Sequence, residues 1–277
     1  MRQLSGVRND MRRIAHISDL HFGAEDPQVA AGLLDDLARQ SPHFVAVSGD
    51  LTQRATPSQF LAARAYLECI SVPQLVVPGN HDIPLYNVWA RWTRPLMNYR
   101  RYITDDLYPF YHDGEMAVAG VNSARASRWK EGRISFAQID RLKEQFESVP
   151  AGLFKVLVCH HPFIPPENRT DAEIVGRGLL ALRMLAASGC ALILSGHLHQ
   201  AYSGDVRPYH LEITRSIIVA QAGTAISHRR RDEANAYNQI TVDGDRLDLE
   251  VRAWDGHQFA TAGRREYCRT DDGWIVQ

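Results

Sequence analysis

Residues of the metal-ligating kind follow one predicted strand after another in this chain. Each strand is a short apolar run, and each is followed at once by aspartate, asparagine or histidine. In chain order these residues are Asp19 and His21, Asp50, Asn80 and His81, His160, and His197 and His199. Ligands of an open α/β sheet bind beyond the carboxyl ends of its strands. The pattern therefore predicts a fold in which segments far apart in sequence meet at one edge.

Strands and helices alternate in the first part of the chain. Apolar runs predict strands at 13–18, 44–48 and 73–78, and helical signals predict helices at 27–39 and 57–68. Because strands separated by helices form βαβ units, this part is expected to build a largely parallel sheet.

The remainder of the chain is predicted to contain elements of both kinds. Strands are expected at 116–122, 153–159 and 190–195, with helices at 135–146 and 172–187. The last part is strand-like at 216–221, 236–242 and 247–253, with short turns between the runs. These last strands are expected to form a second, more antiparallel sheet.

Neither a long linker nor an internal repeat divides the chain. Residues 11–277 are expected to form a single domain behind a flexible tail at 1–10. Residues 84–112, rich in aromatic residues and arginine, predict one or two short helices over the site. This segment is either a lid that contacts substrate or a helix packed on the body. The motifs leave the C-terminal extension 244–277 unexplained, so completion of the core is expected there, with a homodimer contact as an alternative.

Composition argues against two classes of partner. The formal net charge is -1 and the pI is about 6.9, so no strong field attracts the chain to nucleic acid or anionic membrane. Apolar runs stay shorter than the ~20 residues of a membrane span. The polar N-terminal stretch 1–13 lacks the apolar core of a signal peptide. A cytoplasmic protein with a small-molecule substrate is expected.

The candidate ligands indicate a class of metal. Imidazole, carboxylate and amide oxygen without thiolate suit manganese, iron, zinc, cobalt or nickel. Two carboxylates, Asp19 and Asp50, together with at least four imidazoles exceed the needs of one ion. Two divalent ions carry more positive charge than these two carboxylates and one hydroxide can neutralise. The site is therefore expected to attract phosphate.

These residues, in this order, resemble the motifs of the calcineurin-like metallophosphoesterase superfamily. The motifs are Asp-x-His, Gly-Asp, Gly-Asn-His-Asp, a later His and Gly-His-x-His, and they span residues 19–199. The resemblance implies an α/β fold, a four-layer α/β/β/α sandwich with two mixed sheets. It also implies a ligand set: Asp19, His21 and His199 for one metal, Asn80, His160 and His197 for the other, and Asp50 between them.

The resemblance further implies a mechanism for two residues of the third motif. A hydroxide activated by the metals attacks phosphorus in line. His81 contacts the phosphate and protonates the leaving oxygen. Asp82 is expected to orient His81 by fixing its tautomer.

The substrate is constrained less closely. The chain is most similar to the bacterial class III cyclic-nucleotide phosphodiesterase branch, which implies 3′,5′- or 2′,3′-cyclic nucleotides. A nucleotide-lipid pyrophosphatase, a general phosphoesterase and a non-catalytic metal-binding scaffold are alternatives. Candidate phosphate contacts are Asn122, Arg125 and Arg54, which lie near the motifs. The arginine triplet at 229–231 is either a further phosphate contact or a solvated loop, and the solvated loop is favoured.

Overall fold

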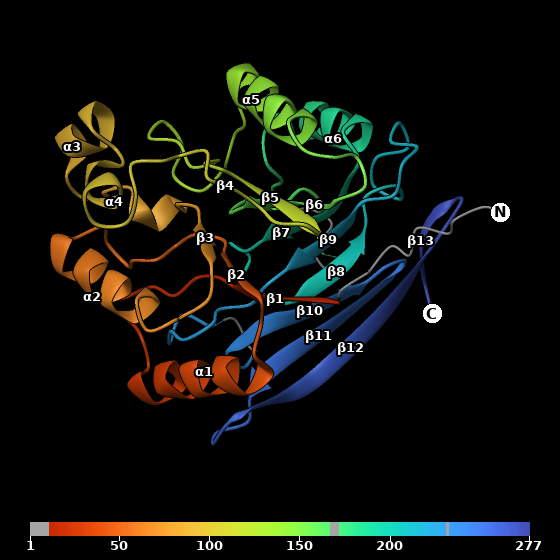
Figure 1. The fold of residues 1–277 in the computed structure, drawn as a ribbon. Coiled ribbons are helices and arrows are strands. Elements are labelled where there is room, and N and C mark those ends of the chain that lie inside the picture. The colour runs from red at the N-terminus through yellow and green to blue at the C-terminus, as the bar shows by residue number, and fades with distance from the viewer. Residues whose placement is uncertain (1–10, 167–171, 231–232) are drawn as a thin grey trace.

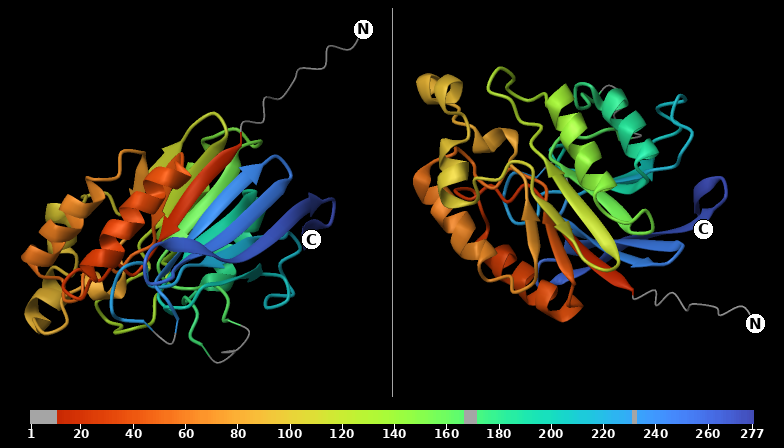
Figure 2. Two further views of the ribbon diagram at one scale, coloured as in Figure 1. Left: turned by 90° about the horizontal axis from the view of Figure 1, so that it is seen from below. Right: turned by 45° about the horizontal axis from the view of Figure 1, so that its top comes forward.

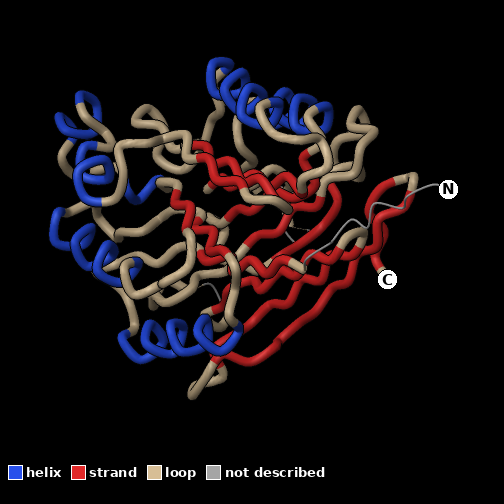
Figure 3. Tube along the Cα trace, in the orientation of Figure 1, coloured by secondary structure: helices blue, strands red, loops and turns tan. Residues whose placement is uncertain are grey.

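The computed structural model describes residues 11–166, 172–230 and 233–277. Two β-sheets lie face to face, and helices pack on part of the outer face of each sheet (Figure 1). The tube in Figure 3 shows the same layers, with strands inside and helices outside. This arrangement confirms the predicted α/β/β/α sandwich. The expected tail at 1–10 lies outside the described residues.

The first sheet has seven strands in the order β13-β12-β11-β10-β1-β2-β3. Their bounds are β1 (Arg12–Ile17), β2 (Phe44–Val47), β3 (Gln74–Val76), β10 (Ala236–Asp243), β11 (Arg246–Trp254), β12 (Phe259–Thr270) and β13 (Gly273–Val276). Strand β1 pairs in parallel with β2 and antiparallel with β10. The parallel N-terminal strands and the antiparallel C-terminal strands therefore belong to one mixed sheet.

The second sheet has six strands in the order β4-β5-β6-β7-β9-β8. Their bounds are β4 (Phe110–His112), β5 (Met116–Val121), β6 (Phe154–Cys159), β7 (Cys190–Ser195), β8 (Tyr202–Asp205) and β9 (Ile218–Gln221). The prediction that the last strands share a separate antiparallel sheet is wrong. β9 pairs in parallel with β7, whereas β10 and β11 join the first sheet through the open edge of β1.

The helices divide between the two outer faces. Their bounds are α1 (Pro27–Gln40), α2 (Pro57–Leu67), α3 (Val88–Thr93), α4 (Met97–Tyr102), α5 (Phe136–Glu147) and α6 (Gly178–Ala187), with a short 3₁₀ turn η1 (Asn80–Asp82). Helices α1 and α2 pack on the first sheet, and α5 and α6 pack on the second. The two pairs lie on opposite sides of the strands in the right-hand view of Figure 2.

Alternating side chains of the buried strands separate the layers. Ile14 and Phe44 point between the two sheets, where they meet Val156 and other residues of the second sheet. Their neighbours Ala15 and Val45 point to the opposite face, beneath α1 and α2. Because successive side chains of a strand face opposite ways, a strand that is apolar throughout fits only a layer covered on both sides.

Helix α6 begins at Gly178 and not at residue 172 as predicted. The residues just before it make other backbone bonds instead. Val175 donates its N–H to the carbonyl of Pro162, and Gly176 forms a bridge with Arg133. These long-range bonds use backbone groups that a helix would need, so the helix starts only after them.

The segment 84–112 forms α3, α4 and the edge strand β4. Helix α4 packs on the body, since Leu96 and Tyr99 join the core beneath α2. The hydroxyl of Tyr99 donates to the carbonyl of Val76 at 3.0 Å. Helix α3 leaves Trp89 and Trp92 exposed. Part of the segment is therefore core, and a lid role stays a prediction for α3 and its flanks. Across the described chain, no helix has the length and apolar character needed to cross a bilayer.

A buried ion pair ties α1 to the C-terminal strands. Arg252 of β11 donates from Nε and Nη2 to the Asp36 carboxylate at 2.6 and 2.9 Å, and Tyr237 donates its hydroxyl at 2.7 Å. Asp36 is fully buried. Burial alone would raise the pKa of Asp36, but the bonds from Arg252 and Tyr237 hold that pKa below its ordinary value of 3.8.

Arg252→Met is expected to lower the free energy of unfolding by about 3–5 kcal/mol, because it leaves the Asp36 carboxylate buried without its main partner. Urea denaturation measures this change. Arg39→Met is the matched control: Arg39 also contacts Asp36, at 3.0 Å, but its side chain is 52% exposed. Loss of an exposed ion pair costs at most about 1 kcal/mol.

The difference between wild type and Arg252→Met should also depend on pH. A lowered pKa means that the ionised Asp36 stabilises the fold above its ordinary pKa, and that this stabilisation disappears as the pH falls through the folded pKa. The unfolding free energies of the two proteins should therefore begin to converge as the pH falls below about 4. Equal losses for Arg252→Met and Arg39→Met would contradict the assignment.

Candidate metal centre

The residues predicted as metal ligands meet at the carboxyl ends of β1, β2, β6 and β7 and at η1, which follows β3. Metal-ligating atoms lie within 4.8 Å of one another in three overlapping groups. The groups are Asp19, His21 and His199; Asp19, Asp50 and His160; and His160, His161 and His197. Two of them share Asp19 and two share His160, so the groups form one continuous cluster. Asn80 joins it through His160 and His197.

The backbone at these positions is left-handed and not extended. Five of the predicted ligands have positive φ: Asp19 (54°), His21 (49°), Asp50 (53°), His197 (73°) and His199 (57°). The side chains of Asp19 and His21, two residues apart, therefore meet on left-handed and not on extended backbone. Left-handed backbone costs a residue with a side chain about 1–3 kcal/mol and persists only where surrounding contacts enforce it.

In one half of the cluster, polar atoms face one another without hydrogen bonds. The Nε2 atoms of His21 and His199 each lie 3.6 Å from Asp19 Oδ1. Asp19 Oδ1 and both ring nitrogens of His21 are buried without a hydrogen-bond partner among the described residues. Buried polar atoms are normally paired. Atoms that share a cation at ~2.0–2.2 Å lie about 3–3.6 Å apart, so the spacing fits a metal.

The other half centres on Asn80. Its Oδ1 lies 3.1 Å from His160 Nε2 and 3.0 Å from His197 Nδ1. Asp50 Oδ2 lies 3.4 Å from His160 Nε2 and 3.8 Å from His21 Nε2, between the two halves. Burial alone would lower the pKa of His160, but Asp50 beside it raises that pKa to about 9. Burial lowers the pKa of His197 to about 3.

Hydrogen bonds direct one nitrogen of each of two histidines into the cluster. His160 Nδ1 donates to the carbonyl of Ser48 at 2.7 Å. His199 Nδ1 lies 2.5 Å from the hydroxyl oxygen of Thr224, which itself donates to the carbonyl of Arg229. Both hydrogen bonds therefore place the ring proton on Nδ1. Nε2 is therefore the nitrogen that faces the cluster, as in histidines that bind metals.

Two glycines allow the loops to approach closely. A Cβ at Gly79 would lie 2.1 Å from Asp50 Oδ1 and 2.4 Å from the Asp50 backbone nitrogen. A Cβ at Gly196 would lie 1.9 Å from Ser18 Oγ and 2.5 Å from Asp19 Oδ2. Each distance is too short for a real side chain, so only glycine fits between the candidate carboxylates and the neighbouring loop.

His81 lies beside the cluster, with its ring edge-on to that of His21 at 4.9 Å between centroids. The backbone N–H of His81 donates to Asp50 Oδ1 at 2.8 Å, and its ring Nδ1 donates to the carbonyl of Gln53 at 3.2 Å. The Gln53 carbonyl, and not Asp82, therefore sets the tautomer of His81.

Asp82 organises the backbone around His81. Its carboxylate accepts from the N–H groups of Gly79, Leu51 and Thr52 at 2.9, 3.1 and 2.9 Å, and from the Thr52 hydroxyl at 3.0 Å. None of these bonds involves the imidazole, so the predicted direct orientation of His81 by Asp82 is wrong. Burial, followed by repulsion from Asp50, raises the pKa of Asp82 to about 6.

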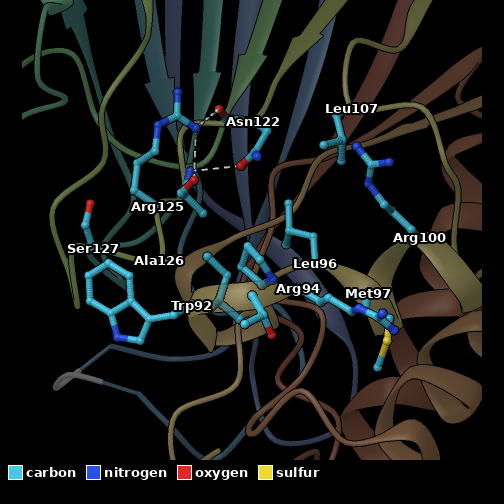
Figure 4. Close-up of a pocket in the computed structure, with 14 residues that line it drawn as sticks. Trp92, Arg94, Leu96, Met97, Arg100, Leu107, Asn122, Arg125, Ala126 and Ser127 are labelled. Atoms are coloured by element: carbon cyan, nitrogen blue, oxygen red, sulfur yellow. Dashed lines mark hydrogen bonds between the residues drawn. The ribbon is translucent and has the colours of Figure 1, made fainter. Parts of the chain in front are cut away.

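None of the three candidate phosphate contacts is hydrogen-bonded to a predicted metal ligand among the described residues. The Arg54 guanidinium stacks on Tyr86, 5.2 Å from its ring centre. Asn122 and Arg125 line a pocket of about 690 Å³ beside the α3–α4 segment (Figure 4). Arg125 donates to the carbonyls of Asn122 and Ala124, and the Asn122 amide oxygen accepts from the Ala124 N–H. These hydrogen bonds shape the loop, and the role of the three residues in binding stays a prediction.

The pocket is lined mostly by apolar side chains and reaches the residue that follows the Gly-Asn-His-Asp motif. Ile83, next to Asp82, lines it together with Leu96, Leu107 and Trp92. Arg94 and Arg100 also line it.

Contacts at the site also include residues that the motifs did not select. Arg229 Nη1 lies 2.9 Å from His81 Nε2. Its only sequence signal was the arginine triplet, which resembles a solvated loop; Arg231 lies outside the described residues. Thr224 accepts a hydrogen bond from His199, as described above. A threonine in a loop does not stand out in the sequence, so the motifs could not identify it. His161 bonds Ser123 through Nδ1 and the Lys130 carbonyl through Nε2, so both its ring nitrogens are engaged.

Curated proteins similar to this chain are named phosphodiesterases. One from Synechococcus sp., named a probable cyclic nucleotide phosphodiesterase, is 29% identical over 205 residues, 68% of this chain and 74% of that one. The glycerophosphodiester phosphodiesterase GpdQ of Enterobacter lignolyticus is 29% identical over 259 residues, 79% and 87% of the two chains.

Solved structures share the fold at low identity. A dimetal phosphatase from Danio rerio superposes with a TM-score of 0.64 at 13% identity, covering 87% of this chain and 96% of that one. A purple acid phosphatase from yellow lupin seeds (Lupinus luteus) has a TM-score of 0.67 at 14% identity, over 92% of this chain. The chain spans 53% of that phosphatase.

The family model described as calcineurin-like phosphoesterase matches residues 12–201, which hold every predicted ligand. The match covers more than half of the chain and agrees with the sandwich and with the cluster at the strand ends. This chain belongs to the calcineurin-like phosphoesterase family.

Proposed function

We propose that this chain is a dinuclear-metal-dependent phosphodiesterase whose leading substrate class is the cyclic nucleotides. One observation carries the proposal: buried carboxylates and imidazoles from distant segments converge into overlapping groups of metal-ligating atoms. The family uses a dinuclear metal centre, and the chain has candidate groups for it. The names of similar proteins support a phosphodiester substrate.

The ligand spacing supports a division between two ions. Asp19, His21 and His199 would hold one ion, Asn80, His160 and His197 the other, and Asp50 both. The position of Asp50 Oδ2, within 4 Å of a histidine from each set, supports the bridging role. Manganese or iron is proposed, with zinc, cobalt or nickel as alternatives. When bound, the ions lower the pKa of water and neutralise phosphate charge.

His81 is proposed to donate a proton to the leaving oxygen. The Gln53 carbonyl holds the proton of Nδ1, so Nε2 is the nitrogen left for proton transfer. The His81 backbone is held by Asp50, which places the ring against the cluster. Asp82 acts through the backbone of Gly79 and of the loop after β2, and so positions both Asp50 and His81.

The apolar pocket beside α3 and α4 favours a second candidate. Its volume of about 690 Å³ and its apolar walls would accommodate a large organic group next to Ile83. A nucleotide-lipid diphosphate has such a group beside its phosphates. A lipid-linked nucleotide pyrophosphatase is therefore the alternative activity.

Turnover by the manganese-loaded protein tests the activity. We expect cleavage of bis-p-nitrophenyl phosphate and of cyclic AMP, with p-nitrophenyl phosphate as the monoester comparison. His81→Ala should lower kcat by about 100- to 10,000-fold, the range of a lost general acid. Metal content should stay unchanged. His257→Ala, at an exposed histidine of the β11–β12 turn, is the matched control and should retain full activity.

Each other outcome has a definite meaning. Diester cleavage without cleavage of either 3′,5′- or 2′,3′-cyclic AMP would reject cyclic nucleotides and favour the diphosphate substrates. No turnover with any metal tested, at full metal occupancy, would reject the enzyme and favour a metal-binding scaffold. Equal activity of His81→Ala and wild type would reject the role of His81.

Gly79→Ala is expected to remove metal from the protein. The added methyl group would collide with the backbone as well as the carboxylate of Asp50, so Asp50 must move. Metal content measured by mass spectrometry should fall from two ions to one or fewer per chain, the loss expected for a bridging ligand. In Gly114→Ala, the new methyl group meets nothing within 4 Å, and metal content should not change. Full occupancy of Gly79→Ala would contradict the bridging role of Asp50.

A further inference from the structure

The loop between β9 and β10 holds Arg229 at the edge of the candidate metal centre. Its backbone is tied to the segments that carry the candidate ligands. Ala222 donates its N–H to the carbonyl of Ser195 at 2.8 Å, and Ala225 donates to that of Ser18 at 3.0 Å. These acceptors lie just before His197 and Asp19. The loop is therefore hydrogen-bonded to the segments that carry both halves of the cluster.

Both backbone polar groups of Arg229 are hydrogen-bonded to nearby hydroxyl groups. Its N–H donates to the Ser227 hydroxyl at 3.2 Å, and its carbonyl accepts from the Thr224 hydroxyl at 3.1 Å. The same Thr224 hydroxyl supports His199. One hydroxyl thus links the position of a predicted ligand to that of the arginine.

The guanidinium of Arg229 has only weak, neutral partners among the described residues. Nη1 lies 2.9 Å from Nε2 and 3.2 Å from Nδ1 of His81, and 3.4 Å from Gln53 Oε1. A donor that is nearly equidistant from both ring nitrogens cannot lie along the lone pair of Nε2, the one nitrogen of the neutral ring that can accept. The His81 contact is therefore a poorly directed one, unlike the paired fork that Arg252 makes with Asp36.

This cation also lacks a counter-charge in the part of the chain that the structure describes. No carboxylate there lies within 4 Å of the Arg229 guanidinium, and the residue is half-buried. Two divalent ions nearby would add further positive charge. An arginine held in this way favours an anion, and its planar fork suits phosphate oxygens.

We propose that Arg229 binds the phosphate of the substrate, on the His81 side of the metal centre. The guanidinium exchanges its contact with His81 for a non-bridging phosphate oxygen. This release also frees His81 Nε2 to take up a proton from water and to pass it to the leaving oxygen. The inference rests on the proposed function, because it assumes that the centre binds a phosphoryl group.

Phosphate binding to the metal-loaded protein tests the inference without any turnover. Isothermal titration calorimetry with inorganic phosphate should give a Kd about 10- to 100-fold higher for Arg229→Gln than for wild type, the effect of a lost charge-assisted hydrogen bond. Arg229→Lys should recover part of the affinity. Arg230→Gln, at the exposed neighbouring residue, is the matched control and should bind as wild type does. Metal content and thermal unfolding of every variant establish that the centre and the fold are intact.

Two results would overturn the inference. One is a phosphate Kd of Arg229→Gln within twofold of wild type. If kcat is then reduced while KM is unchanged, Arg229 is only a positioning residue for His81. The other is wild-type protein that carries both metals and binds no phosphate. If Arg229→Gln unfolds, the comparison of Arg229→Lys with wild type decides. A third combination separates the two proposals. If Arg229→Gln loses phosphate binding while the wild-type protein cleaves no diester, the inference is supported and the proposed function is rejected.

Discussion

A histidine of the second sheet holds the ends of the first sheet's strands in place. His160 follows β6, and its Nδ1 donates across the sandwich to the carbonyl of Ser48 at 2.7 Å. Its Nε2 then lies 3.1 Å from Asn80 Oδ1 and 3.4 Å from Asp50 Oδ2. Because the carbonyl can only accept, this bond sets both the tautomer and the direction of the ring. The two halves of the cluster meet around this bridge between the sheets.

Burial makes the cluster costly for a chain without cations. Asp19 and Asp50 are at most 1% exposed, and Asp19 Oδ1 has no hydrogen-bond partner among the described residues. An unsatisfied buried polar group costs about 1–3 kcal/mol. The left-handed backbone of the same residues adds strain. Stability given up at one place in an otherwise well-packed sandwich is the pattern of a functional site.

The layers around the cluster explain how these costs are tolerated. The apolar strands β1 and β2 are buried on both faces, between the helices of one side and the second sheet. The loops that follow them have little freedom, because Asp82 ties the ends of β2 and β3 together through backbone N–H groups. The loops that carry the candidate ligands are thus held by hydrogen bonds to main-chain groups and by close contacts at Gly79 and Gly196.

The sequence alone determined the layered α/β class and the identity of the candidate ligands. Apolar runs mark buried strands, residues of the metal-ligating kind recur directly after them from Asp19 to His199, and the resemblance of these motifs to a known family implied the sandwich and the ligand set. Three features were decided only by the tertiary structure: the sheet that β10 and β11 join, the left-handed backbone of Asp19 and His21, and the contact of Arg229 with His81. Strand pairing and long-range hydrogen bonds depend on which edges and carbonyl groups lie nearby in space. Local sequence does not contain that information.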